Sequence, residues 1–207
     1  MSNTNLLFIC RELKKSDIEQ VSIIEEDAFP ELFPQTQFEK ELQRPQSTIL
    51  VSKLNELNSK SIKLMPSSKN LYYKQGKTGW KKGDDFLTGF LTYWELFDEI
   101  HIMAIGVRRE YTNLKIASLL LTECINKIIK KSFNKITLEV RKSNIPAIGL
   151  YTNFGFEIVG ERKKFYPDNH ENALIMSLSS ILSEEYKYKI KEIQKTIESK
   201  SNSLFLD

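Results

Sequence analysis

The chain has 207 residues, of which 41% are hydrophobic and 28% charged, as expected for one globular domain with room for an appendage. A formal net charge of +3 is too small to indicate nucleic-acid binding by itself. The sequence has no apolar run long enough to span a membrane, and its first residues lack the basic start and long apolar run of a signal peptide. We therefore expect a cytoplasmic protein with no membrane partner.

The N-terminal quarter predicts a strand, two helices and a second strand. Residues 6–13 form an apolar run typical of a strand. Ser16, followed three residues later by Glu19, has the pattern of a capping box at the start of a helix. A second short helix is expected over residues 35–44, and the Thr-Ile-Leu-Val run within 47–54 predicts the next strand.

The composition changes over residues 55–84, which we interpret as a basic insertion. The segment holds seven lysines against two acidic residues, Glu56 and Asp84, a local charge of +5. Its Lys-, Ser- and Asn-rich composition favours a solvated, mobile extension. Aromatic residues among the lysines keep open a second interpretation, a contact with RNA or with the acidic surface of a ribosome, because stacking and phosphate attraction need those two residue types. These aromatic residues are Tyr72, Tyr73 and Trp80.

The centre of the chain predicts an antiparallel pair of strands, residues 86–95 and 99–107, joined by a tight turn. Gly89 and Gly106 inside these strands indicate bulges or the close approach of another backbone.

A long amphipathic helix follows, then a strand over 136–140 and a short helix over 145–154. The apolar face of the long helix consists of Ile116, Leu120, Leu121, Cys124, Ile125, Ile128 and Ile129. This order predicts two parallel strands joined by a right-handed crossover. The turn between the strand and the long helix is a favourable place for an anion, because the first N–H groups of a helix lack internal partners.

Residues 157–166 and 172–178 predict a closing hairpin, with His170 in its turn and therefore exposed, not catalytic. Residues 1–180 are expected to form one domain, and 181–207 a charged helix, capped by Ser183, with a frayed tail. The helix has a narrow apolar stripe that has to bury itself on the domain, on the insertion or on a partner. The stripe consists of Tyr186, Ile190, Ile193 and Ile197.

The two cysteines, Cys10 and Cys124, lie on apolar faces of predicted elements, which favours buried thiols over a disulfide. The sequence contains no cluster with metal-ligand spacing and no serine or cysteine nucleophile recognisably paired with a base, so we expect no metal.

Several blocks in the second half of the chain resemble the GNAT (GCN5-related) N-acetyltransferases. The more specific blocks are LEVRKSN at 138–144, AIGLY at 147–151, GF at 155–156, Arg162, YP at 166–167 and ALIM at 173–176. Together they are similar to the RimI-type enzymes, which acetylate the N-terminal alanine of a ribosomal protein. The resemblance covers roughly residues 6–178, allowing for an insertion.

Residues 107–117, VRREYTNLKIA, resemble the acyl-CoA loop of the same family, which usually reads Gln/Arg-x-x-Gly-x-Gly/Ala. Thr112 stands in place of the Gln or Arg, Lys115 in place of the first Gly, and Ala117 fits the final small position. Glycine lets a backbone approach a diphosphate and adopt unusual dihedral angles, which a lysine does not do easily, although its ammonium can bind phosphate as a point charge.

The resemblance implies an α/β (α+β) fold with a mixed, mostly antiparallel sheet, a central parallel pair splayed to hold acyl-CoA, and helices on both faces. It also implies acetyl transfer from acetyl-CoA, without a metal, to the N-terminal α-amine of a protein, with the N-terminal alanine of a ribosomal protein as the implied acceptor. Alternatives are a GNAT enzyme acting on lysine or a small amine, and a weakly catalytic or non-catalytic acyl-CoA-binding interaction module. The implied cofactor residues are Ile105, Gly106, Val107, Thr112, Asn113, Leu114, Lys115, Ile116, Ala117, Ser118 and Asn144.

By the same resemblance Glu139 is the general base, acting through a water, and Tyr151 is the general acid that protonates the CoA thiolate. Each has a simpler alternative: Glu139 as an outward-facing strand residue, and Tyr151 as a core aromatic. Asn144 as a plain helix N-cap would look identical to a cofactor ligand. The apolar segment 28–34 is either a connector packed on the core or a wall of the acceptor site. The implied acceptor residues are Phe29, Leu32, Phe33 and Tyr166.

Overall fold

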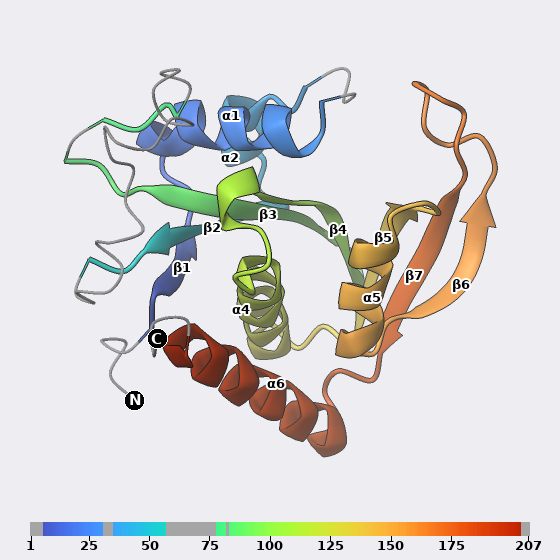
Figure 1. Ribbon diagram of the computed structural model, residues 1–207. Coiled ribbons are helices and arrows are strands. Elements are labelled where there is room, and N and C mark those ends of the chain that lie inside the picture. Colours follow the sequence, from blue (N-terminus) through green and yellow to red (C-terminus); the bar gives the residue numbers. More distant parts are fainter. Residues whose placement is uncertain (1–5, 31–34, 57–77, 82, 204–207) are drawn as a thin grey trace.

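The computed structural model describes residues 6–30, 35–56, 78–81 and 83–203. In this part of the chain the strands form one seven-stranded sheet with the order β1-β2-β3-β4-β5-β7-β6 (Figure 1). Neighbouring strands are antiparallel except β4 and β5, which are parallel as the sequence predicts. The strands are β1 (Phe8–Glu12), β2 (Ser47–Leu54), β3 (Leu87–Leu96), β4 (Glu99–Val107), β5 (Lys135–Arg141), β6 (Glu157–Arg162) and β7 (Ala173–Ser179).

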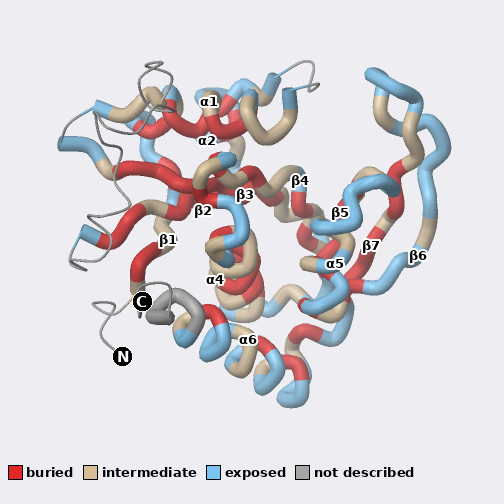
Figure 2. The backbone as a smooth tube through the Cα atoms, viewed as in Figure 1, coloured by how far each residue is buried: buried red, intermediate tan, exposed pale blue. Residues whose placement is uncertain are grey.

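Helices cover both faces of the sheet. On one face lie α1 (Ile18–Ala28) and α2 (Phe38–Gln43), which pack on β2 and β3 through a small hydrophobic core. On the other face α4 (Ile116–Lys130), α5 (Ile145–Phe154) and α6 (Glu184–Ser203) share the larger core. Figure 2 shows the buried central strands between these layers and the exposed outer strand β6. The seven predicted apolar positions of α4 are buried, apart from the half-buried Ile129.

The parallel pair is short. Only Ile100 to Ile102 of β4 align with Ile136 to Leu138 of β5, and beyond this point the two strands have no paired register. The sheet is therefore splayed at the end of β4 that leads to α4, as the family resemblance implies. A bulge at Met103 of β4, opposite Thr92 and Tyr93 of β3, lies beside the same opening.

The two glycines of the central strands are sites of close approach. A Cβ on Gly106 would lie 2.5 Å from the Phe90 ring, and one on Gly89 would lie 2.8 Å from the Gly106 carbonyl oxygen. Because real Cβ atoms do not come this close to other heavy atoms, side chains at either position would push β3 and β4 apart.

One local prediction is wrong. Ser16 does not cap α1, because Ser16 lies inside a 3₁₀ turn, Lys15–Asp17, and α1 begins at Ile18. The Asp17 carboxylate accepts the Lys14 N–H at 2.7 Å and pairs with Arg11 at 2.6 Å. Arg11 also pairs with Asp85, 74 positions away, at 2.7 Å, and this network holds the turn in a conformation that a local capping pattern does not specify.

Helix α6 packs on the domain itself. Tyr186, Ile190 and Ile197 are buried, and the Tyr186 hydroxyl donates to the Phe154 carbonyl oxygen at 2.9 Å. The Ser183 hydroxyl accepts the Tyr186 N–H at 3.2 Å, as expected of an N-cap. Of the three surfaces considered for the apolar stripe, the structure therefore selects the domain. None of the helices in the described part of the chain is long and apolar enough to cross a bilayer.

The ends of the basic segment are tied to the sheet. The Asn55 N–H donates to the Leu7 carbonyl oxygen, next to β1. The Leu54 N–H donates to the Phe86 carbonyl oxygen, so the end of β2 is bridged to the start of β3 where the segment leaves and re-enters the sheet. The Trp80 ring packs edge-to-face on Phe86 with centroids 6.0 Å apart. Trp80 is thus used in packing, whereas Tyr72 and Tyr73 lie outside the described residues.

Candidate active site

Two cavities open on opposite faces of the splayed sheet and meet at its gap. The first, of about 1060 Å³, lies between the N-terminus of α4, α5 and α6, and we call it the α4 cavity. The second, of about 730 Å³, lies between α1, the sheet and the β6–β7 turn, and we call it the α1 cavity. Both cavities are lined by Ile105, Asn144, Ala147 and Tyr151. A molecule lying in one cavity can therefore reach a molecule in the other.

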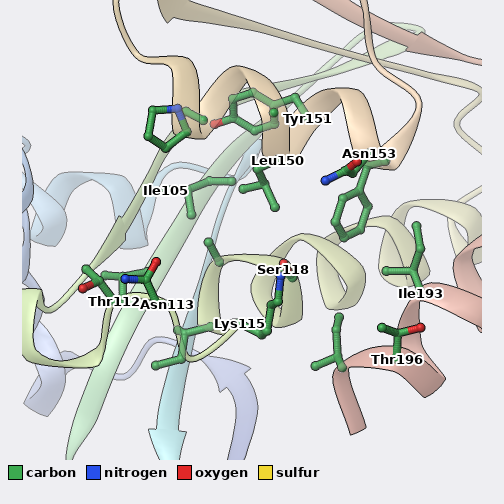
Figure 3. Close-up of a pocket in the computed structure, with 18 of the residues that line it drawn as sticks. Ile105, Thr112, Asn113, Lys115, Ser118, Leu150, Tyr151, Asn153, Ile193 and Thr196 are labelled. Carbon is green, nitrogen blue, oxygen red and sulfur yellow. The ribbon is translucent and has the colours of Figure 1, made fainter. Parts of the chain in front are cut away.

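The loop before α4 contains two residues in the left-handed backbone conformation. Asn113 and Lys115 both have positive φ angles, 65° and 62°, and the helix starts directly after Lys115 (Figure 3). The first free N–H groups and the partial positive charge of the helix dipole are therefore at the wall of the α4 cavity. Lys115 adopts the left-handed conformation that a glycine would favour.

Most of the expected cofactor residues lie together in the α4 cavity. Gly106 and Leu114 are absent from its lining. The residues that line it are Ile105, Val107, Thr112, Asn113, Lys115, Ile116, Ala117, Ser118 and Asn144. Asn144 caps α5, because its side-chain oxygen accepts the Ala147 N–H at 3.1 Å, which leaves its amide nitrogen for a ligand.

Helix α6 also lines the α4 cavity, which the sequence did not predict. Figure 3 shows Ile193 and Thr196 of α6 across the cavity from Ser118 on α4 and Asn153 on α5. The amphipathic stripe indicated that α6 had to pack somewhere, but no local pattern specified this position.

Glu139 lies on β5 and lines the α1 cavity. Its side chain is 11% exposed and is held by two basic groups: His101 Nε2 is 2.8 Å from Oε2, and Arg162 is 2.9 Å from Oε1. The hydrogen bond from His101 lowers the pKa of the Glu139 carboxyl, with a further contribution from the Arg162 charge, against the opposing effect of burial. Glu139 is therefore a paired, ionised carboxylate at a cavity wall and does not point into open solvent.

His101 is a site residue that sequence reasoning missed. It lies on β4 opposite Thr137 of β5, and its Nδ1 atom is 3.1 Å from the Thr137 hydroxyl. Because side chains alternate along a strand, Thr137 and Glu139 share a face, and His101 contacts both. The predicted parallel pair and the alternation of side chains could have indicated His101. However, the register that aligns His101 with Thr137 is not specified by the sequence of either strand.

Tyr151 lies on α5 where the two cavities meet. It is 7% exposed, and its ring packs against Phe156 with centroids 5.6 Å apart. Burial raises the pKa of its phenol, so the hydroxyl stays protonated throughout the neutral range. The residue is both a core aromatic and a wall of each cavity, so the two interpretations of Tyr151 are compatible.

The acceptor residues implied by the family resemblance are only partly described. Phe29 and Tyr166 line the α1 cavity, whereas Leu32 and Phe33 lie outside the described residues. Tyr166 lies beneath the Arg141 guanidinium, 3.8 Å from its ring centroid, and Arg141 also pairs with Asp168 and Glu171. His170, in the same turn, is exposed as expected. Within the described residues no group of three or more His, Cys, Asp or Glu side chains is arranged to hold a metal ion.

The sequence profile of the Acetyltransferase (GNAT) family matches residues 18–156, more than half of the chain, and the chain belongs to this family. It is 32% identical to the [ribosomal protein bS18]-alanine N-acetyltransferase of Salmonella typhimurium over 97 residues. The aligned region covers 46% of this chain and 66% of that one. With the enzyme of the same name from Haemophilus ducreyi it shares 30% identity over 160 residues, 76% of this chain and 97% of that one. The chain spans only about three fifths of the length of several such bacterial relatives, for example 57% of that from Escherichia coli K12.

Solved structures of this fold superpose well. The ribosomal-protein-S18-alanine N-acetyltransferase of Escherichia coli gives a TM-score of 0.62 at 22% identity, over 84% of this chain and 94% of that one. Arabidopsis thaliana NAA60 in complex with acetyl-CoA gives 0.63 at 18% identity, over 83% and 98% of the two chains. At these identities the likeness establishes the fold, which is the mixed, mostly antiparallel GNAT sheet expected from the sequence.

Proposed function

We propose that this protein transfers an acetyl group from acetyl-CoA to the N-terminal α-amine of a protein, most specifically a ribosomal protein that begins with alanine. The observation that carries the proposal is the meeting of two cavities at the splayed end of β4 and β5. A paired carboxylate, Glu139, lines one cavity, a helix N-terminus lines the other, and Tyr151 lies at their junction. The names of the relatives from Salmonella and Haemophilus support the choice of acceptor.

The α4 cavity fits the cofactor. The Thr112–Ser118 loop would hold the diphosphate, because its N–H groups and the Lys115 ammonium complement negative charge. Asn144 would donate from its amide nitrogen, and Ile105 and Leu150 offer apolar contact for the pantetheine arm. When bound, acetyl-CoA supplies the thioester from which the acetyl group is taken.

Glu139 and His101 would receive the acceptor amine. An ionised carboxylate attracts an ammonium and orients it, but its lowered pKa makes it a weak final proton acceptor for a group with a pKa of about 7.7–8.0. His101 is hydrogen-bonded to the same carboxylate and places an imidazole beside it, a group that can take part in proton transfer. We therefore propose that Glu139 acts as the base together with His101, directly or through a water.

The acid–base properties of the site favour an α-amine over a lysine. At pH 7.5 roughly a third of α-amines are neutral, against about a thousandth of lysine side chains, from pKa values of about 7.7–8.0 and 10.4. A site that contains one partly neutralised carboxylate has to deprotonate only part of the α-amines that bind, but nearly all of the lysine side chains. Tyr151, kept protonated by burial, would donate its proton to the departing thiolate sulfur.

The basic segment 55–84 is proposed to contact RNA or the acidic surface of the ribosome, an inference that rests on its seven lysines and on the ribosomal acceptor. Within this proposal the protein acts in the cytoplasm. Co-sedimentation with ribosomes at low and high salt, with and without residues 57–77, tests the contact. We expect the full chain to sediment at low salt only and the shortened chain to remain in the supernatant.

The proposed activity is tested by mixing the protein with acetyl-CoA and a peptide that begins with alanine, and by measuring the release of free CoA thiol. We expect release that depends on the peptide, and a rise in melting temperature with acetyl-CoA alone, because a ligand that binds only the native state stabilises it. No thermal shift at millimolar acetyl-CoA would contradict cofactor binding. A shift without thiol release would favour a binding module over an enzyme.

A further inference from the structure

Thr137 is a buried strand residue whose hydroxyl the proposed reaction does not use. It lies on β5, two residues before Glu139, and is 8% exposed. Threonine packs well in strands, so packing alone could explain its presence. Its hydroxyl oxygen, however, is 3.1 Å from Nδ1 of His101, and Nε2 of the same ring is 2.8 Å from the Glu139 carboxylate. The imidazole is thus held between a hydroxyl and a carboxylate.

One end of this row of side chains reaches the acceptor side of the site. The described residues that line the α1 cavity include Glu139 but neither His101 nor Thr137. Thr137 also does not belong to the lining of the α4 cavity. Any effect of Thr137 on the reaction therefore has to pass through the His101 ring to the Glu139 carboxylate.

The hydrogen-bonding capacity of each group indicates which ring nitrogen carries the proton. An ionised carboxylate only accepts hydrogen bonds, so Nε2, which faces Glu139, carries an N–H. In a neutral imidazole the other nitrogen, Nδ1, then has a lone pair and needs a donor. Among the described residues, the Thr137 hydroxyl is the hydrogen-bond partner found for Nδ1.

The Thr137 hydroxyl has one hydrogen and three acceptors within reach. The distance to Nδ1 is 3.1 Å, whereas Oε1 of Glu99 and the carbonyl oxygen of Ile100 are both 3.5 Å away. The Glu99 carboxylate also has a partner of its own, because the Lys135 ammonium lies 2.6 Å from Oε2. Hydrogen bonds from a hydroxyl are weak at 3.5 Å, so the shortest contact favours donation to Nδ1.

We propose that Thr137 is a positioning residue for the acetyl transfer: its hydroxyl donates to Nδ1 of His101 and fixes the ring so that Nε2–H holds the Glu139 carboxylate. This inference rests on the proposed function. A ring turned by 180° would place carbon atoms where the two nitrogens now lie and would lose both hydrogen bonds. Because Arg162 holds the other oxygen of Glu139, the carboxylate is then oriented at both of its oxygens.

The position of the proton on His101 can be measured by NMR of protein labelled with ¹⁵N at histidine. The chain has two histidines, His101 and His170, so the His170→Asn variant assigns the signals. A protonated ring nitrogen and a bare one give well separated ¹⁵N signals. At the pH of the turnover assay we expect a proton on Nε2 and none on Nδ1. A proton on Nδ1, alone or together with one on Nε2, would overturn the proposal.

Thr137→Val keeps the branched shape and removes the hydroxyl. It should lower kcat for a peptide that begins with alanine about threefold to tenfold, the usual effect of one neutral hydrogen bond. The KM values for peptide and acetyl-CoA should stay within about twofold, because Thr137 lines neither cavity. Thr137→Ser retains the hydroxyl and should restore most of kcat. An unchanged kcat in Thr137→Val, or an equal loss in Thr137→Ser, would overturn the proposal.

Thr122→Val is the matched control, because Thr122 is a buried threonine on α4 that lines neither cavity. The same chemical change should leave kcat unaltered there. A loss of kcat in Thr122→Val equal to that in Thr137→Val would mean that any buried threonine matters, and would overturn the positioning role.

A double-mutant cycle separates positioning from packing. In His101→Asn the shorter amide can still meet Thr137 but does not extend to Glu139, so the connection is already broken. Thr137→Val should then change kcat by less than about 1.5-fold in this background, and the same threefold to tenfold loss in both backgrounds would overturn the proposal. If no peptide is acetylated, the proposed function fails, while the ring nitrogens of the wild type still decide whether Thr137 donates to His101. The same measurement decides if Thr137→Val does not fold.

Discussion

Lys115 offers a test in which stability and cofactor affinity change in opposite directions. Its backbone has φ 62° and ψ 17°, where an L-residue loses about 1–2 kcal/mol relative to an unstrained conformation. Glycine avoids this strain but loses about 0.5–1 kcal/mol more backbone entropy on folding. Lys115→Gly should therefore raise the free energy of unfolding by about 0.5–1 kcal/mol. At this chain length that corresponds to a melting temperature about 1–4 °C higher without ligand.

Acetyl-CoA should bind this more stable variant less tightly. The exposed Lys115 ammonium lines the cavity beside the first turn of α4, and an exposed charge pair contributes about 0.2–1 kcal/mol. Its loss should raise the Kd for acetyl-CoA about 1.5-fold to fivefold, as measured by calorimetry at low salt. The difference should shrink at high salt because the interaction is screened.

Asn113→Gly is the matched control, because Asn113 has nearly the same positive φ and carries no charge. It should change the melting temperature in the same direction and show no salt-dependent loss of affinity. Tighter binding of acetyl-CoA by Lys115→Gly would refute the reasoning, since it would mean that the lysine obstructs the diphosphate and does not compensate for the missing glycine.

Three further predictions concern the catalytic residues and the insertion. Glu139→Gln and Tyr151→Phe should each lower turnover about 10²- to 10⁴-fold. Circular dichroism should show that both variants remain folded. Near-normal rates in both would mean that the two residues only pack. Because the folded-state pKa of Glu139 is lowered, the stability that the ionised carboxylate contributes should be complete above about pH 4.5 and disappear as the pH falls through the folded-state pKa. Urea unfolding of the wild type and Glu139→Gln at several pH values measures this contribution. A higher free energy of unfolding for the wild type that persisted at the lowest pH would contradict it. Replacing residues 57–77 with a short Gly-containing turn should preserve the fold and acetyl-CoA binding, and collapse of the domain would show that the segment belongs to the core. The replacement stops before Trp80, whose ring packs on Phe86.

Elements with strong periodicity were predictable from the sequence. The face of α4 from Ile116 to Ile128 follows a 3.6-residue repeat, and the strand–helix–strand order specified the parallel pair β4–β5. The match extends to Ser47–Leu54, where prediction and structure have the same bounds. These features depend on residues close to one another in the chain, so a single sequence records them.

Features that depend on distant partners were not predictable in this way. Before α1, Arg11 pairs with Asp17 and also with Asp85, which is 74 positions away, and the register of two strands placed His101 against Glu139. Each of these residues is unremarkable in its own segment, and its partner becomes apparent only when the fold brings distant donors and acceptors together.

The central claim is that an α-amine is acetylated at the junction of the two cavities. One peptide tests it most directly: it begins with a free alanine and contains an internal lysine, and the acetylated nitrogen is located by tandem mass spectrometry after incubation with acetyl-CoA. The account predicts acetylation of the N-terminal nitrogen, strongly reduced in Glu139→Gln. Acetylation of the lysine in preference to the N-terminus would contradict it.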